Sequence, residues 1–295
     1  MLMNRRTFFK RCLWSTTAGA VVGCGYHSTL VEPRRVGINH VRVPVRGLPR
    51  AFDGLTIAQL SDLHRSRVIS VEYLNHCVDL ANALRPDLIT FTGDYIMHTK
   101  RLAALDAALI GDRELAPRFV REVAGVIGRA HARLGVFTVL GNHDHWYDGE
   151  PITAAIRDAG ATVLRNANAT VHINGEVLPI VGLGDLWTEG LDFTTAFAGV
   201  DAPFTLVLMH NPDAFARWRR PGAQLILAGH THGGQVKLPL IGAPMVPSRY
   251  GQRYAHGLYP HADAWMYVNR GVGMIYPPVR LNCPPEIALL RLESA

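Results

Sequence analysis

Residues 136–144 read VFTVLGNHD, an apolar run of strand length followed by a glycine and three side chains of metal-binding type. The same order recurs at four other places in the chain. The apolar runs are residues 55–60, 88–91, 205–209 and 225–228, followed in turn by Asp62 and His64, by Gly93 and Asp94, by His210, and by Gly229, His230 and His232. Short apolar runs bounded by such residues predict buried strands.

Longer helical patterns separate these runs, at roughly 70–84, 113–132, 152–159 and 212–219. Ser70 is a suitable N-cap for the first of them. The alternation of strand and helix predicts an α/β fold. Because the carboxyl ends of parallel strands share one edge of a sheet, we expect the polar residues that follow the five runs to meet at one site.

The converging residues form a set of donors for two metal ions. The set is Asp62, His64, Asp94, Asn142, His210, His230 and His232. It is too large for one ordinary transition-metal site and suits two ions that share a bridging carboxylate. Imidazole, carboxylate and amide ligands without a thiolate favour Mn, Fe or Zn over Ca or Mg. Residues two apart point the same way in extended backbone, so Asp62 with His64 and His230 with His232 are expected to act as pairs.

The five blocks together resemble the calcineurin-like metallophosphoesterase superfamily. That family's pattern is D-x-H, G-D, G-N-H-[DE], a lone H and G-H-x-H, in the order found here, and the resemblance covers roughly residues 53–292. It implies a fold of two mixed β-sheets packed as a sandwich, with helices on the outer faces. It also implies a dinuclear metal centre at the strand ends.

The resemblance implies a role for each site residue. Asp62, His64, Asp94 and His232 would hold the first ion, and Asp94 as the bridge, Asn142, His210 and His230 would hold the second. His143 matches the family's catalytic histidine, which is not a ligand. We expect the neighbouring Asp144 either to orient that imidazole or to lie on an exposed turn.

The implied activity is hydrolysis of a phosphodiester or phosphomonoester. A hydroxide bridging the two ions would attack phosphorus in line, with His143 as proton donor. One alternative is a pyrophosphatase of a lipid-linked or nucleotide-sugar substrate at the membrane, and an alternative of another class is a non-catalytic metal-binding module. Nucleic acid is not an expected partner, because four of the 30 Lys and Arg lie in the first 24 residues and leave the body nearly neutral.

The C-terminal part is similar to an exported or membrane-associated bacterial branch of these phosphoesterases. The similarity lies in residues 233–235, 269–273 and 280–286. Some members of this branch hydrolyse a lipid-linked pyrophosphate. Arg270 and Arg280 are candidates for binding substrate phosphate through bidentate contacts, the alternative being a solvated or structural role.

The N-terminus resembles a twin-arginine export signal. Arg5 and Arg6 precede an apolar run that ends near Cys24, which predicts the twin-arginine machinery as a partner and a periplasmic or cell-envelope location. The run can end in ordinary cleavage after Ala20 or in a lipobox that acylates Cys24 and tethers the protein to a membrane. A first helix of the fold is the alternative to both. We therefore divide the chain into a signal segment 1–24, a linker and first strand region 25–52, and a metallophosphoesterase domain 53–295.

Two further features remain open in the sequence. Cys77 and Cys283 can pair only if the fold brings them together, and Cys77 lies on an apolar helical stripe that favours a buried free thiol. Residues 238–247 read LPLIGAPMVP, which is apolar but broken by prolines. We expect this stretch to be a packing loop over the core, the alternative being a lip that faces lipid or substrate above the metals.

Overall fold

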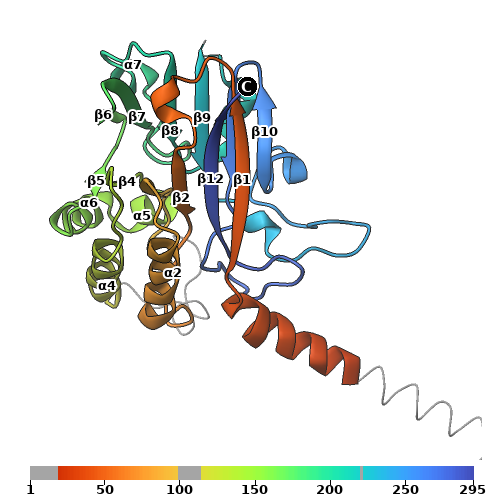
Figure 1. The fold of residues 1–295 in the computed structure, drawn as a ribbon. Coiled ribbons are helices and arrows are strands. Elements are labelled where there is room, and N and C mark those ends of the chain that lie inside the picture. Colours follow the sequence, from red (N-terminus) through yellow and green to blue (C-terminus); the bar gives the residue numbers. More distant parts are fainter. Residues whose placement is uncertain (1–18, 99–113, 220–221) are drawn as a thin grey trace, which may run out of the picture.

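The computed structural model describes residues 19–98, 114–219 and 222–295, and two six-stranded sheets dominate it (Figure 1). The first sheet consists of β1 (Gly37–Val45), β12 (Glu286–Ser294), β2 (Thr56–Leu60), β3 (Leu88–Phe91), β4 (Val136–Thr138) and β5 (Thr162–Val163), in that spatial order. The second consists of β10 (Gly257–His261), β11 (Ala264–Val268), β9 (Ala223–Ala228), β8 (Phe204–Leu208), β7 (Glu176–Gly182) and β6 (Ala167–Ile173).

Both sheets are mixed, as the resemblance implied. In the first, β2, β3, β4 and β5 run parallel, and β12 is antiparallel to β2 but parallel to β1. In the second, β7, β8, β9 and β11 run parallel, whereas β6 and β10 at the edges are antiparallel to their neighbours. The carboxyl ends of the parallel strands within each sheet therefore lie at one edge.

Three apolar clusters hold the layers together. Ile57 and Leu88 of the first sheet pack against Leu206 and Leu225 of the second, so the core between the sheets is built from both. Helices α2 (Val71–Ala83), α4 (Ala116–Gly128) and α6 (Gly149–Asp158) cover the outer face of the first sheet. The short helices α7 (Phe193–Ala196) and η4 (Pro212–Arg217) lie on the second. The fold is a sandwich with helices outside, as predicted.

The helical patterns are found close to where they were expected. Ser70 caps α2 by accepting a hydrogen bond from the backbone N–H of Tyr73 at 3.2 Å. α6 begins earlier than its pattern because Asp148 accepts a hydrogen bond from the backbone N–H of Glu150 at 3.1 Å. The stretch 212–219 forms a 3₁₀ helix that ends at Arg217.

The region before the first metal block is partly integral to the fold. β1 pairs with β12 over its whole length, from Gly37 beside Glu286 to Val45 beside Ser294. Before β1, residues 19–26 are α-helical and continue into η1 (His27–Val31) and η2 (Glu32–Arg34). The paired Arg5 and Arg6 lie outside the described residues. Among the helices of the described ranges, none combines the length and apolarity that spanning a membrane requires.

The cysteines in the part of the chain that the structure describes are free thiols. Cys77 and Cys283 are both buried and are not paired with each other, so the interpretation of Cys77 as a buried free thiol is confirmed. Burial raises the pKa of Cys77 to about 12, which keeps the thiol protonated and unreactive.

The apolar stretch 238–247 does not cover the core along its whole length. Leu240, Ile241 and Met245 are among the most exposed large apolar side chains of the described residues, whereas Ala243 is buried. The expectation of a packing loop is therefore wrong for most of this stretch. The reason is a tight pairing of residues 238 and 242 that turns the tip outward.

Candidate metal centre

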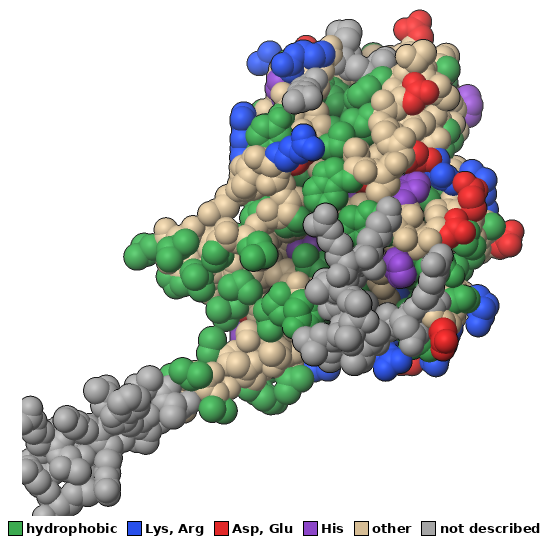
Figure 2. Space-filling model, turned by 180° about the vertical axis from the view of Figure 1, so that it is seen from behind, with side chains coloured by type: hydrophobic (Ala, Val, Ile, Leu, Met, Phe, Trp, Pro, Cys, Tyr) green, Lys and Arg blue, Asp and Glu red, His purple; other side chains and the backbone are tan. Residues whose placement is uncertain are grey.

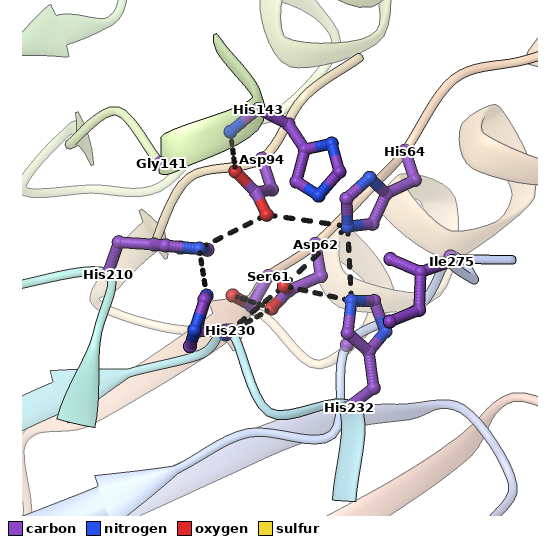
Figure 3. Close-up of polar contacts among 12 residues, drawn as sticks. Ser61, Asp62, His64, Asp94, Gly141, His143, His210, His230, His232 and Ile275 are labelled. Carbon is purple, nitrogen blue, oxygen red and sulfur yellow. Dashed lines mark hydrogen bonds and ion pairs between the residues drawn. The ribbon is translucent and has the colours of Figure 1, made fainter. Parts of the chain in front are cut away.

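The residues that follow the five strands come together in one buried cluster (Figure 3). Asp62 and His64 follow β2, Asp94 follows β3, His210 follows β8, and His230 with His232 follow β9. Three overlapping groups have ligand atoms within 4.8 Å of one another: Asp62, His64 and His232; His64, Asp94 and His143; and Asp94, His210 and His230. The convergence predicted from the sequence is present.

The first group surrounds the imidazole nitrogens of His64 and His232. Their Nε2 atoms are 3.0 Å apart. Asp62 Oδ1 lies 3.3 Å from His232 Nε2, and Asp94 Oδ2 lies 3.5 Å from His64 Nε2. Asp62, His64 and His232 thus form one group of three donors, and Asp94 adjoins it through His64.

The group of Asp94, His210 and His230 lies on the other side of the Asp94 carboxylate. Asp94 Oδ2 is also 3.1 Å from His210 Nε2, which in turn is 3.2 Å from His230 Nδ1. The same carboxylate oxygen therefore faces both groups, which is the position of a bridging ligand. Asn142 is buried, and its Oδ1 has no hydrogen-bond partner within the described ranges. An orphaned amide oxygen of this kind fits a metal ligand better than a structural residue.

The backbone at this site is left-handed. Five of the seven predicted ligands have positive φ: Asp62 (51°), His64 (44°), Asp94 (58°), His230 (72°) and His232 (53°). The expectation that the residues two apart converge through extended backbone is therefore wrong. Left-handed backbone at a non-glycine residue is uncommon and persists where the surrounding structure enforces it, which is typical of functional sites.

Close backbone approach explains two of the glycines. A Cβ on Gly141 would collide with the carboxylate and backbone of Asp94, and one on Gly229 would collide with Ser61 and the carboxylate of Asp62. Both positions therefore require a residue without a side chain so that two metal blocks can touch.

Hydrogen bonds from neighbouring groups orient the donors. Asp62 Oδ2 accepts from the hydroxyl of Ser61 at 2.5 Å and from the backbone N–H of His230 at 3.0 Å. His210 Nδ1 lies 2.7 Å from the carbonyl oxygen of Thr92, so Nδ1 carries the proton and Nε2 is left for Asp94 and a metal. The sequence analysis missed Ser61 and Thr92, although each stands directly beside a block.

Two tryptophans border the centre and were also missed. The ring of Trp187 meets that of His230 edge-on at 4.3 Å between centroids and is 42% exposed. The ring of Trp146 lies 4.6 Å from that of His143. Trp187 follows β7, a strand without a metal block, so no repeated pattern identified it.

The electrostatics favour bound cations. Burial raises the pKa of Asp94, but the imidazoles of His210 and His143 outweigh it and hold this pKa well below the usual value. Burial likewise opposes protonation of His210, yet the carboxylate of Asp94 raises its pKa to about 10. Burial and the charge of His210 lower the pKa of His230 to about 3. The ionised carboxylates need compensating positive charge in this buried pocket. A proton on His210 supplies part of it, and a bound metal ion would displace that proton from Nε2.

His143 lies at the first group with its ring across that of His64, 4.7 Å between centroids. Its Nδ1 is hydrogen-bonded to the carbonyl oxygen of His98. Because that carbonyl can only accept, the Nδ1 atom donates and Nε2 remains available to a substrate. Burial lowers the pKa of His143 to about 4 despite the nearby charge of Asp94.

Asp144 is neither on an exposed turn nor in contact with the imidazole of His143. It is fully buried, and its Oδ2 accepts from the backbone N–H groups of Asp94 and Gly141, both at 2.9 Å. Oδ1 accepts from the backbone N–H of Tyr95 at 2.8 Å. Burial, with the charge of Asp94, raises the pKa of Asp144 to about 7. Asp144 thus holds the backbone of the bridging residue in place.

Arg270 and Arg280 bind protein groups in this structure. The Arg270 guanidinium lies 2.7 Å from Glu286 through Nη2. Arg280 is fully buried and donates to the carbonyl oxygens of Cys283 and Gly273 at 2.9 and 2.6 Å. These contacts give both arginines a structural part in the C-terminal loops, and their assignment to substrate phosphate stays a prediction.

Comparisons with known proteins agree with the site. A sequence model described as Calcineurin-like phosphoesterase matches residues 55–234. The chain is 33% identical over 297 residues to the uncharacterized metallophosphoesterase YkuE of Bacillus subtilis, covering 99% of this chain and 98% of that protein. It is 34% identical to the phosphodiesterase YaeI of Escherichia coli, covering 79% and 80%. It is 27% identical to the UDP-2,3-diacylglucosamine pyrophosphatase LpxG of Chlamydia muridarum, covering 83% and 86%.

Proposed function

Because the chain belongs to the calcineurin-like metallophosphoesterase family of hydrolases, we propose that it hydrolyses a phosphodiester or pyrophosphate bond at a dinuclear metal centre. One observation carries this proposal: Asp94 Oδ2 faces His64 at 3.5 Å and His210 at 3.1 Å. A carboxylate oxygen shared by two groups of donors is the arrangement that a pair of ions needs.

We assign the residues to the two ions as the resemblance implies. Asp62, His64, Asp94 and His232 would hold one, and Asp94, Asn142, His210 and His230 would hold the other. Mn, Fe or Zn suits this set of ligands. When bound, the pair supplies a water nucleophile at neutral pH and neutralises charge on the phosphate oxygens.

His143 serves as the proton donor to the leaving oxygen. Its Nδ1 is held by the carbonyl of His98, which fixes the ring and presents Nε2 to the centre. A negatively charged phosphoester beside Nε2 would favour a proton on that nitrogen, and the fixed ring could then pass this proton to the leaving oxygen. Asp144 acts through Asp94 and is a positioning residue.

The relatives guide the choice of substrate. One is named a phosphodiesterase and another a pyrophosphatase of a diacylated nucleotide sugar. Both names describe cleavage at a phosphorus that carries two substituents, which favours a diester or pyrophosphate over a monoester. The lipid-linked pyrophosphate is the second candidate, and the LpxG resemblance is the observation in its favour.

We further propose that the protein acts outside the cytoplasm. The paired Arg5 and Arg6 before an apolar run support export. Cys24 is exposed on the N-terminal helix, which leaves it accessible for acylation. Mass spectrometry of the mature N-terminus decides between a lipid on Cys24 and cleavage after Ala20.

Protein of known metal content tests the reaction. Its metals are removed with chelator, and turnover of a chromogenic phosphodiester and of the matching monoester is measured before and after Mn²⁺, Fe²⁺ or Zn²⁺ is added back. We expect no turnover without metal, recovery with at least one of these ions, and faster cleavage of the diester. Turnover that persists in chelator, or none with any ion, would contradict the proposal.

A further inference from the structure

A hairpin with an apolar tip, residues 238–245, projects from the body of the protein (Figures 1 and 2). Its side chains Leu240, Ile241 and Met245 are 108%, 63% and 80% exposed. Scattered apolar residues on a surface are ordinary, but three large ones gathered on one projection mark a contact surface. The question is what covers them.

The hairpin is held in a fixed shape without burying its tip. The backbone N–H groups of Leu238 and Gly242 each donate to the other residue's carbonyl, at 2.8 and 2.9 Å. Gln252 accepts from the backbone N–H of Ala243 at 3.0 Å and donates to the carbonyl of Ile241 at 3.1 Å. Leu240 has a φ of 66°, a strained conformation for leucine. These contacts keep the apolar side chains of the tip exposed to water. Burial of these side chains against a partner would therefore be favourable.

The base of the hairpin is anchored beside the metal centre. Gly234, two residues after His232, lies so close to Ala243 and Met245 that a Cβ would collide with both. On the far side, the backbone N–H of Arg249 donates to Asp213 at 2.8 Å. The base of the hairpin is therefore close to the residues that would hold the metals.

The sequence around the apolar tip is basic. Lys237, Arg249 and Arg253 flank it, and the sequence contains no Asp or Glu between Asp213 and Asp263. Asp213 is buried and bound by the hydroxyl of Ser248 and the backbone of Arg249. Apolar side chains flanked in the sequence by basic residues match the interface of a bilayer that contains anionic lipids.

The N-terminal helix also carries exposed apolar residues. Val21, Val22 and Tyr26 are 67%, 72% and 60% exposed. Figure 2 shows hydrophobic atoms at the projecting hairpin and on the described part of this helix, both toward the left of the view.

From these features we propose that hairpin 238–245 docks onto a phospholipid bilayer with anionic headgroups. Leu240, Ile241 and Met245 enter the acyl boundary, and Lys237, Arg249 and Arg253 meet the headgroups. This contact does not require the metal-dependent reaction, but it presents the active site to phosphoesters held in the membrane.

Vesicle binding by the full chain tests the contact. We expect co-sedimentation with vesicles of phosphatidylcholine mixed with phosphatidylglycerol and weaker binding to phosphatidylcholine alone. Leu240→Glu combined with Ile241→Glu should lower the partition coefficient ~10–100-fold, because two apolar groups no longer enter the bilayer. Replacing Arg249 and Arg253 by Gln should lower binding to the anionic vesicles about 5-fold per side chain.

Val177→Glu is the matched control, because Val177 is 39% exposed on β7, away from the hairpin, and should leave binding unchanged. A direct readout is Leu240→Trp, whose added emission should shift to shorter wavelength with anionic vesicles. No binding by the wild-type chain, or binding without that shift, overturns the proposal.

Light scattering without lipid tests whether the hairpin instead contacts a second copy of the chain. If the wild-type chain is a dimer and the double Glu variant a monomer, the hairpin contacts a second copy and the proposal is wrong. Turnover of a soluble chromogenic phosphodiester should be the same in the double Glu variant and the wild type. Loss of docking is thereby distinguished from failure of the proposed function.

Discussion

Asp94 connects more parts of the site than any other residue. Its Oδ2 faces both groups of donors, its Oδ1 accepts from the backbone N–H of His143 at 2.8 Å, and its own N–H donates to Asp144. A change at Asp94 should therefore affect metal binding, whereas a change at His143 should affect the chemistry.

His143→Ala should retain both metals and lose turnover by ~10²–10⁴-fold, the usual contribution of a general acid. Asp94→Ala should lose metal as well as turnover, because the shared ligand is gone. Emission spectroscopy of metal content beside steady-state rates checks both variants. A fully active His143→Ala protein would rule out the assigned role.

Gly229→Ala should distort the site. The new Cβ would meet Ser61 and Asp62, so the chain must shift where two blocks touch. We expect weaker metal binding and a loss of about 1–3 kcal/mol in the free energy of unfolding, as for overpacking. Gly125→Ala is the control, since its Cβ would meet nothing within 4 Å in helix α4. It should gain ~0.5–1 kcal/mol. Denaturant unfolding and metal content measure both variants, and equal behaviour of the two would refute the close-approach argument.

Among the elements, helix α5 (Asn142–Tyr147) was not predicted, because six residues are too few for an apolar periodicity to register. Its start is set by Asp144, which accepts from the N–H of Gly141 and of the β3 loop. Asp144→Ala should therefore cost ~3 kcal/mol of stability by leaving buried N–H groups unpaired. Thermal unfolding measures this. A variant as stable as the wild type would show that the carboxylate is dispensable.

β12 begins with a buried acid that gives the protein a pH dependence. Glu286 accepts from the backbone N–H and Nη2 of Arg270 at 2.9 and 2.7 Å. Burial alone would raise the pKa of Glu286. His256 and Arg270 outweigh this effect and lower the pKa from 4.5 to about 2. Because the pKa of Glu286 is lower in the folded than in the unfolded protein, its ionised carboxylate stabilises the fold. This contribution is complete above pH 4.5 and is lost as the pH falls toward 2.

Glu286→Gln should accordingly remove on the order of 3 kcal/mol at neutral pH and flatten the fall in stability between those two pH values. Urea unfolding across this range compares it with Glu293→Gln on the same strand. Glu293 is partly exposed and pairs with Arg42 at 3.6 Å, so its removal should change little. A Glu286→Gln profile parallel to that of the wild type would argue against the assignment.

Sequence and structure agree where the signal is local. The five strands and the residues after them are encoded in contiguous blocks, so both could be predicted. The left-handed backbone of Asp62 and His64 could not be, because it is enforced by contacts with Asp94 and Gly93 that are remote in sequence. The partner of β1 was equally hidden, since β12 lies at the other end of the chain.

At the scale of the whole molecule, a fragment 53–295 should not behave as an independent domain. Without β1 and η3 (Arg50–Phe52) it lacks Val43, Val45 and Phe52, which are 0%, 1% and 0% exposed in the core between the sheets. Each removal costs about 1.5–3 kcal/mol. Calorimetry should show cooperative unfolding for a chain that starts at Glu32 and none for one that starts at Asp53. Equal transitions in the two chains would support 53–295 as a domain of its own.

Both sheets contribute candidate metal ligands. Asp62, His64, Asp94 and Asn142 follow strands of the first sheet, and His210, His230 and His232 follow strands of the second. Ions bound by all seven residues would link the two sheets. The free energy of metal binding would then contribute to the free energy of folding. A cell short of these metals would then lose the protein itself to proteolysis as well as its activity.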